Sequence, residues 1–297
     1  TGIGGSEVVV RRCEVVGTDE VQVMQELVQR TWSPRSRLHV GDVAWERALN
    51  AGRRGDTWRT AFWEDNGQVV AWGWAEPDHL SLVVDPEWAE VAGDVLGWFQ
   101  EYAPDGAVSV LEAETHLVAA LEKAGYRADD DAPYFTHHRI ALSDLGTPVV
   151  PDGFTLRHVQ PDEVQQRAAV HRAAWSDWGP SKVTDEDMAA VMSTWPYKPE
   201  LDWIVEAPNG EFAATALIWD DKIHGIGLVE PVGCAPAYRR RGLAQAVNLA
   251  ALHALREAGA THAMVCPRGD DAYPKARALY QSIGFRPGAR SRLYVRR

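Results

Sequence analysis

The residues that indicate chemistry most directly lie in segment 232–244, at a turn between an expected strand and an expected helix. Arg239, Gly242 and Ala244 form an Arg-x-x-Gly-x-Ala pattern there. A helix N-terminus carries unpaired backbone N–H groups and the positive end of the helix dipole, so it attracts a diphosphate. Gly242 lets the backbone come close, because a Cβ would occlude the phosphate. The pattern predicts an anion site, and a plain turn at the helix start is the alternative.

A second pattern follows in residues 276–285, which read Ala-Arg-Ala-Leu-Tyr-Gln-Ser-Ile-Gly-Phe. In order and spacing, the two patterns resemble the signatures of the GNAT superfamily of N-acetyltransferases. The resemblance implies acetyl-CoA as the acetyl donor, with its pyrophosphate at the turn. The cofactor-binding residues that it implies are Val232, Gly233, Cys234, Arg239, Arg240, Arg241, Gly242, Leu243, Ala244, Gln245 and Tyr273.

Tyr280, in the second pattern, is the general acid that the resemblance implies. In the family, the helix with this tyrosine flanks the cofactor, and the hydroxyl lies near the thioester sulfur. The alternative is a core residue of an amphipathic helix whose hydroxyl reaches the surface. Tyr273 stands where many members carry Asn, so the pantetheine contacts of that Asn pass to Asp270, Asp271 or a backbone group.

Glu230 is the candidate general base. Acetyl transfer needs a neutral acceptor amine, because a protonated amine has no lone pair, and a carboxylate within direct or one-water reach supplies this. Glu230 lies on the strand that leads into the turn, where the family often places a base. Alternation puts Glu230, Val232 and Cys234 on one face of a regular strand, but Pro231 favours a bulge or an edge. A salt bridge to a nearby arginine is the alternative role.

Three tryptophans are candidates for the wall of the acceptor pocket: Trp175, Trp178 and Trp219. The first two lie in residues 175–180, after the first helix of the second half, where GNAT members commonly form part of that pocket. Core packing explains Trp175 equally well.

The other polar residues do not assemble a competing site. The ten histidines show no His-x-x-x-His or His-Glu-x-x-His spacing, so no metal site is expected. Gly-x-Ser-x-Gly and Gly-x-x-x-x-Gly-Lys-Ser/Thr motifs are absent from the sequence, which disfavours serine hydrolysis and phosphoryl transfer. The three cysteines are scattered and are expected to be reduced, buried thiols.

The two halves of the sequence repeat one order of elements, which predicts one fold written twice. Each half has an opening strand, a helix, a hairpin at an Asn-Gly turn, a strand ending before Pro, a long helix, a short strand and a last helix. The matched segments are 8–12 and 154–158 for the opening strands, 19–29 and 161–175 for the helices, Asn66-Gly67 and Asn209-Gly210 for the turns, and Gly125 and Gly284 for the closing glycines.

The Pro- and Gly-rich residues 143–153 are the expected linker between domains at 7–142 and 154–297. Each domain is expected to be an α+β domain with a mixed, centrally splayed β-sheet flanked by helices. This layout resembles tandem GNAT proteins, an arrangement also seen in mycothiol synthase. Catalysis is expected in the C-terminal domain.

The N-terminal domain is expected to be degenerate and to bind no cofactor. Aligning Pro86 with Pro236 places Ala89, Ala92 and Asp94 where the second half has the Arg-x-x-Gly-x-Ala pattern. Aligning the closing glycines places Leu121 at the Tyr280 position. This domain is instead expected to form one wall of the acceptor cleft, through exposed aromatic residues such as Trp72 or Trp74.

Composition and charge narrow the class of protein. The 297 residues are 45% hydrophobic and 24% charged, as in ordinary globular proteins. The formal net charge of -12 disfavours nucleic acid as a partner, and the first half carries most of the excess acidity. No apolar run is long enough to span a membrane, and the N-terminus lacks a signal-peptide pattern, so a cytoplasmic location is expected.

The sequence therefore predicts an acetyl-CoA-dependent N-acetyltransferase that moves acetyl directly to a primary amine of a small molecule. A cationic acceptor suits the acidity of the first half, although its identity and the oligomeric state cannot be read from the sequence. The alternative is a non-catalytic acyl-CoA-binding or scaffold protein that uses the same turn.

Overall fold

The computed structural model describes residues 10–17 and 20–296, and every side chain among them except that of Trp178. The chain divides into two compact units. Unit 1 comprises residues 1–37, 53–132 and 291–297, and unit 2 comprises residues 38–52 and 133–290.

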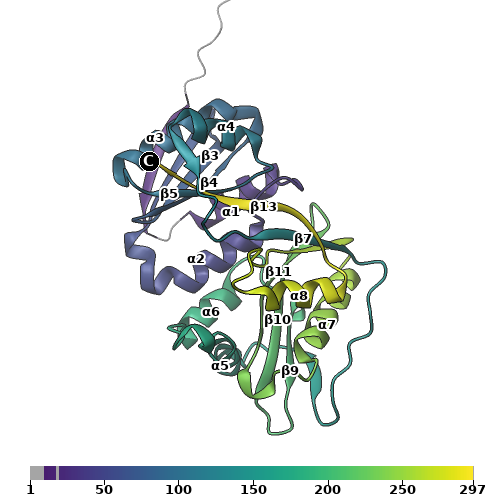
Figure 1. The fold of residues 1–297 in the computed structure, drawn as a ribbon. Helices are drawn as coiled ribbons and strands as arrows, with labels where there is room; N and C mark the ends of the chain where they lie inside the picture. The colour runs from purple at the N-terminus through teal and green to yellow at the C-terminus, as the bar shows by residue number, and fades with distance from the viewer. Residues whose placement is uncertain (1–9, 18–19, 297) are drawn as a thin grey trace, which may run out of the picture. The chain divides into compact units, whose positions relative to one another are not determined.

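Unit 1 is a mixed sheet with helices (Figure 1). Its strands run in the order β1-β2-β3-β4-β5, followed by the end of β13, with β6 also paired to β13. Only β4 and β5 are parallel among the described pairs of this unit. The elements are β1 (Arg11–Val16), α1 (Val21–Thr31), β2 (Arg59–Asp65), β3 (Gln68–Ala75), β4 (His79–Val84), η2 (Pro86–Val91), α3 (Ala92–Tyr102), β5 (Ala107–Leu111), α4 (Thr115–Lys123), β6 (Tyr126–Ala128) and β13 (Arg286–Arg296).

Unit 2 repeats this layout with the strand order β13-β7-β12-β11-β10-β9-β8. Here only β11 and β12 are parallel among the described pairs. Its elements are α2 (Val40–Arg54), β7 (Thr136–Ala141), β8 (Thr155–His158), α5 (Val164–Ala174), η3 (Ser176–Trp178), α6 (Asp185–Ser193), β9 (Asp202–Glu206), β10 (Phe212–Asp221), β11 (Ile226–Cys234), η5 (Pro236–Tyr238), α7 (Leu243–Glu257), β12 (His262–Val265) and α8 (Pro274–Ile283).

The core of unit 2 lies on both faces of β10, which is buried along its whole length. Ala214, Ala216 and Ile218 pack with Val247 and Leu252 of α7, so α7 covers one face. The other face receives α5 and α6, and Figure 1 shows the sheet between these two layers of helices. A sheet buried on both faces explains why β10 reads as a near-continuous apolar run.

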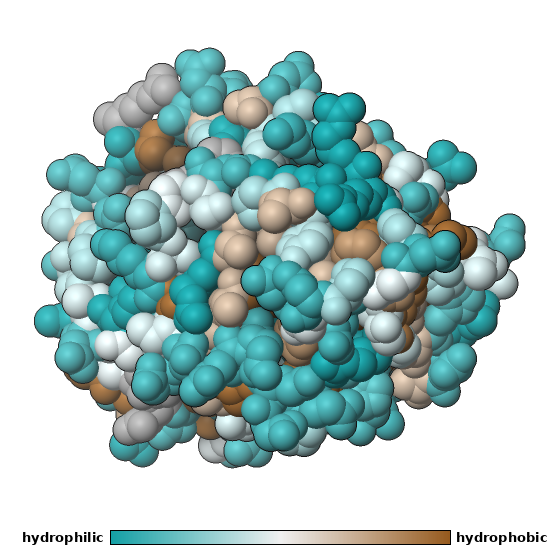
Figure 2. Space-filling model, turned by 90° about the horizontal axis from the view of Figure 1, so that it is seen from below, coloured by the Kyte–Doolittle hydropathy of each residue, from teal (hydrophilic) through white to brown (hydrophobic). Residues whose placement is uncertain are grey.

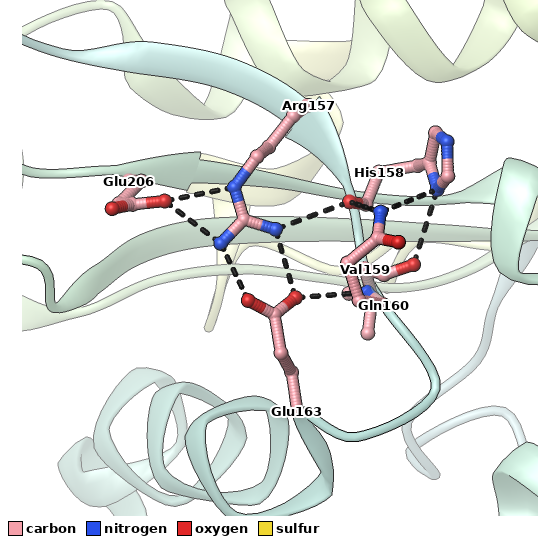
Figure 3. Close-up of polar contacts among 6 residues, drawn as sticks. All are labelled: Arg157, His158, Val159, Gln160, Glu163 and Glu206. Atoms are coloured by element: carbon pink, nitrogen blue, oxygen red, sulfur yellow. Dashed lines mark hydrogen bonds and ion pairs between the residues drawn. The ribbon is translucent and has the colours of Figure 1, made fainter.

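One arginine fastens the edge of this sheet to the start of α5 (Figure 3). Arg157 on β8 forms ion pairs with Glu206 on β9 at 2.7 Å and with Glu163, which precedes α5, at 2.6 Å. Glu163 also accepts the Gln160 backbone N–H. These contacts hold the pKa of Glu163 below its ordinary value, chiefly through the hydrogen bond from Arg157. Through these contacts Glu163 connects the start of α5 to the edge of the sheet.

The two units differ from the continuous domains expected at 7–142 and 154–297. Unit 2 includes residues 38–52, most of which form α2, and it includes residues 133–153 because β7 pairs with β12. Unit 1 takes residues 291–297, because the end of β13 pairs with β5 and β6. Residues 143–153 carry no helix or strand, but Leu145 and Val150 pack against the core of unit 2.

Two aromatic residues expected to be exposed are buried in unit 1. Trp72 is 0% exposed, and its indole N–H donates to the Met24 carbonyl. Trp74 is 8% exposed and packs edge-on against Trp58. The expectation that Trp72 or Trp74 forms a cleft wall is therefore wrong, because both face the interior from the buried strand β3.

Candidate functional site

The site begins where β11 leaves its neighbour β12. The parallel ladder between them ends at Leu228 and Met264, whereas β11 continues to Cys234. The sheet of unit 2 is therefore splayed beside the second half of β11. This opening leads directly to the turn before α7.

A bulge in β11 sets the position of Glu230. Val229 pairs with Ile218 and Val232 pairs with Ala216, so two residues of β11 oppose one of β10. Those two residues are Glu230 and Pro231, and the irregularity that Pro231 suggested is confirmed. The regular alternation that would place Glu230 on the face of Val232 does not apply, because the extra residue breaks the register.

Glu230 is half-buried and held from two sides. Its backbone carbonyl accepts the Trp219 indole N–H at 2.7 Å. Its carboxyl shares a hydrogen bond with the carboxyl of Asp42 and faces the charge of Glu46, both on α2. Burial first, and then these two negative charges, raise the pKa of Glu230 well above its ordinary value. A carboxylate whose pKa is raised toward neutrality suits a general base.

Tyr280 lies on α8, within electrostatic reach of Glu230. The side chain is 7% exposed and packs edge-on against Phe285, with ring centroids 5.7 Å apart. Burial raises the pKa of Tyr280, and the negative charge of Glu230 raises it further, followed by Cys266 and Tyr273. The hydroxyl therefore keeps its proton at neutral pH. The fold brings Glu230, Tyr280 and Tyr273 into one electrostatic neighbourhood.

The turn before α7 has the backbone that the motif suggests. Arg240 and Gly242 both have positive φ, 64° and 76°, and Gly242 is the N-cap of α7. A Cβ added at Gly242 would meet no protein atom within 4 Å. The space beside this helix start is therefore open, next to first-turn N–H groups that have no partner one turn earlier in the helix. The positive φ is the local reason for glycine.

The three consecutive arginines of the turn have different contacts. Arg239 is bound within the fold, to Asp177 at 2.7 Å and to the backbone carbonyls of Ala174 and Cys234 at 3.1 Å each. Arg241 is exposed, with its guanidinium 5.9 Å from the ring centroid of Tyr238. Arg240 is exposed as well.

The remaining residues predicted to bind the cofactor lie around this turn. Val232, Gly233 and Cys234 are half-buried at the end of β11, and burial raises the pKa of the Cys234 thiol. Leu243 is buried, Ala244 is half-buried and Gln245 is exposed in the first turn of α7. Asp270 binds Arg268, and Asp271 binds Arg277.

The tryptophans predicted to line the acceptor pocket differ in their surroundings. Trp219 is 0% exposed, and its indole N–H donates to the backbone carbonyl of Glu230. Trp175 stacks on His171 with ring centroids 4.4 Å apart. It also packs on the backbone of Gly233, where an added Cβ would lie 2.6 Å from its ring. Trp178 belongs to η3, but its side chain lies outside the part of the chain that the structure describes.

Sequence reasoning missed the contribution of α2. Asp42 and Glu46 come from the first half of the sequence, yet they lie in residues 38–52, which belong to unit 2. Both side chains act on the charge of Glu230. The apolar spacing of 40–49 was a signal for a helix. It held no information about which unit the helix joins.

Two properties of the described residues bear on other classes of site. Among the described residues, no group of three or more His, Cys, Asp or Glu side chains is placed to hold a metal ion. In the same residues, no helix combines the length and the apolar character that crossing a membrane requires. The face shown in Figure 2 is mostly hydrophilic, with apolar residues in small patches.

Comparisons with known proteins bear on the family that the chain resembles. Residues 167–285 match the model of the acetyltransferase (GNAT) family. The mycothiol acetyltransferase of Nocardia farcinica is 30% identical over 164 residues, which cover 50% of this chain and 50% of that protein. The alignment thus spans about half the length of this curated relative.

Solved structures extend the likeness in fold to nearly the whole chain. A tandem GNAT protein from the clavulanic acid biosynthesis pathway aligns with a TM-score of 0.61 at 15% identity, over 96% of this chain and 98% of that one. A GCN5-related N-acetyltransferase from Sphaerobacter thermophilus aligns with a TM-score of 0.59 at 18% identity, over 95% and 94%. At these identities the likeness shows the fold alone.

Proposed function

We propose that the chain transfers acetyl from acetyl-CoA directly to a primary amine of a small molecule, because residues 167–285 match the model of the acetyltransferase (GNAT) family. Catalysis takes place in unit 2. The observation that supports this most is that Glu230, on the splayed part of β11, lies close enough to Tyr280 for its charge to raise the pKa of that side chain, while the start of α7 is open.

The chemistry divides between these two side chains. Glu230, directly or through one water, takes a proton from the acceptor ammonium and leaves a nitrogen lone pair. The nitrogen attacks the thioester carbonyl carbon, the C–N bond forms and the C–S bond breaks. Tyr280 gives its proton to the leaving thiolate and recovers one from solvent, to which the nitrogen releases its excess proton. No covalent enzyme intermediate is required.

Backbone groups supply binding and polarisation in this proposal. The first-turn N–H groups of α7 receive the diphosphate, and N–H groups near 232–234 polarise the thioester carbonyl. Arg240 and Arg241 are exposed beside the turn and add positive charge. Arg239 acts through the fold, because its guanidinium is bound to Asp177 and to backbone carbonyls.

The second candidate is an acyl-CoA-binding or scaffold protein without turnover. The raised pKa of Glu230 favours the enzyme, because a purely structural carboxylate gains nothing from a site that disfavours its charge.

Turnover separates the two candidates. The chain is incubated with acetyl-CoA and a panel of polyamines, aminosugars and aminoacyl amines, and free CoA thiol is measured against time. We expect acceptor-dependent release that Glu230→Gln lowers by about 10²-fold. Binding of CoA without release for any acceptor supports the non-catalytic protein.

A further inference from the structure

The N-terminal turn of α2 is fastened to the strand that carries Glu230. The His39 ring Nε2 lies 3.3 Å from the Ile226 carbonyl oxygen, at the start of β11. The backbone at Gly41 packs so closely on Trp219 that a Cβ there would overlap the indole side chain. Trp219 in turn binds the Glu230 carbonyl. This helix start therefore has a fixed position relative to Glu230.

Asp42 closes the same helix turn. The His39 backbone N–H donates to Asp42 Oδ2 at 2.6 Å, and the Gly41 N–H donates to His39 Nδ1 at 3.0 Å. This reciprocal cap fixes the Asp42 carboxyl in one orientation. The same carboxyl shares a hydrogen bond with that of Glu230. Two carboxyl groups form such a bond only when they hold a proton between them.

We propose that Asp42 is a positioning residue for Glu230, an inference that rests on the function proposed above: it shares a proton with the Glu230 carboxyl and thereby sets the pH above which that carboxyl accepts a proton from the acceptor amine. The base is thus a pair of carboxyls, one from each half of the sequence. The pair titrates as a unit.

The charged and titratable groups that face Glu230 come from two helices. Asp42 and Glu46 on α2 raise its pKa, after burial, and Tyr280 on α8 is its acid counterpart. Removing the charge of Asp42 therefore lowers the pKa of Glu230. The acidic limb of the rate profile, where the base becomes deprotonated, then moves to lower pH.

The variant Asp42→Asn tests this directly. The Asn amide oxygen still accepts the His39 N–H, while its NH₂ group donates to ionised Glu230. We expect the acidic limb of kcat/KM to move down by about one pH unit. The matched control is Asp187→Asn, at the same position of the cap of α6, where Asp187 accepts the Thr184 N–H at 2.9 Å. Asp187→Asn should leave the acidic limb of kcat/KM at the pH of the wild type. If the acidic limb lies at the same pH in the wild type and in both variants, the proposal is overturned.

A second measurement needs no activity. Ionised Glu230 costs folding free energy beside Asp42, so wild-type stability should fall, relative to Asp42→Asn, as pH rises from about 5 to about 8. In a Glu230→Gln background this pH-dependent difference should vanish, which thermal unfolding of the four proteins measures. A difference that persists with Gln at 230 contradicts the carboxyl pair. If no amine is acetylated, the proposed function fails while this cycle still decides the role of Asp42.

Discussion

At the scale of single residues, one physical cause suits two side chains to the opposite roles proposed for them. Burial raises the pKa of both Glu230 and Tyr280. For a carboxyl this means a stronger base near neutral pH, whereas for a phenol it means a proton that stays in place until a strong base forms nearby. In the proposed reaction, the leaving thiolate is such a base.

The Tyr280 hydroxyl is tested by Tyr280→Phe, which keeps the ring and its edge contact with Phe285. We expect kcat to fall by about 10²-fold while the KM for acetyl-CoA changes little, because only proton donation in the transition state is lost. Steady-state kinetics measure both constants. Tyr294→Phe, in the core of unit 1, is the control. An unchanged kcat would reduce Tyr280 to a packing residue.

Glu230 is predicted to cost stability as well as to supply chemistry. Its pKa is raised in the folded state, so the stability associated with its neutral form is lost as pH rises from above the unfolded value of about 4.3 through the folded value. Glu230→Gln should therefore unfold at a higher temperature than the wild type at about pH 8 and at nearly the same temperature at about pH 4. Calorimetric scans at the two pH values give the answer, and a lower melting temperature at the higher pH would refute it.

At the scale of elements, the sequence predicted those parts that local patterns determine. The hairpins at Asn66-Gly67 and Asn209-Gly210 are confirmed as β2-β3 and β9-β10, because Asn-Gly turns impose their geometry on a few neighbouring bonds. A bulge or an edge was predicted at Pro231, since the residue lacks a ladder donor, and the structure has the bulge. Residues 8 and 9 of the expected first strand and residue 19 of the expected first helix lie outside the described part.

The sequence did not reveal parts that depend on distant partners. Helix α2 and strand β7 belong to unit 2, and the end of β13 belongs to unit 1. For β7 and β13 the cause is strand pairing with residues far away along the chain. Hydrophobic spacing predicts an element but not its neighbour. The Asp42 contact with Glu230 was therefore out of reach, and so was the burial of Trp72, whose exposure depends on what covers β3.

The turn before α7 is the element whose binding role can be tested by charge. Gly242→Glu places a carboxylate at the helix start and should abolish CoA binding, because it repels the diphosphate where the N–H groups would receive it. Isothermal calorimetry with CoA measures this. Gly259→Glu follows the other end of the same helix, also has positive φ and also meets no atom within 4 Å. This control also places a glutamate at a residue with positive φ, but at the opposite end of α7 from the proposed diphosphate site. Its affinity for CoA should therefore stay near that of the wild type. Equal affinity in all three proteins would exclude the turn as the site.

At the scale of the whole molecule, the two units share a layout but differ at the start of the long helix. In unit 1, η2 runs straight into α3, and the Ala92 N–H already donates to the carbonyls of Ala89 and Glu90. Asp85 accepts the Glu87 N–H, so a carboxylate of the chain already caps the first turn of η2. These groups compete with a phosphate, whereas the start of α7 in unit 2 is open.

Two further side chains of unit 1 differ from those of the site in unit 2. The parallel ladder of β4 and β5 covers only His79 and Leu80 on β4, so this sheet is splayed too, but His116 Nε2 lies 3.1 Å from the Val84 carbonyl oxygen at the end of β4. Leu121, at the position that corresponds to Tyr280, is buried in the core and supplies no proton. We therefore expect one CoA per chain from calorimetric titration of the intact protein, and none for Gly242→Glu. A stoichiometry of two, or one site that survives in Gly242→Glu, would show that unit 1 binds CoA in spite of these contacts.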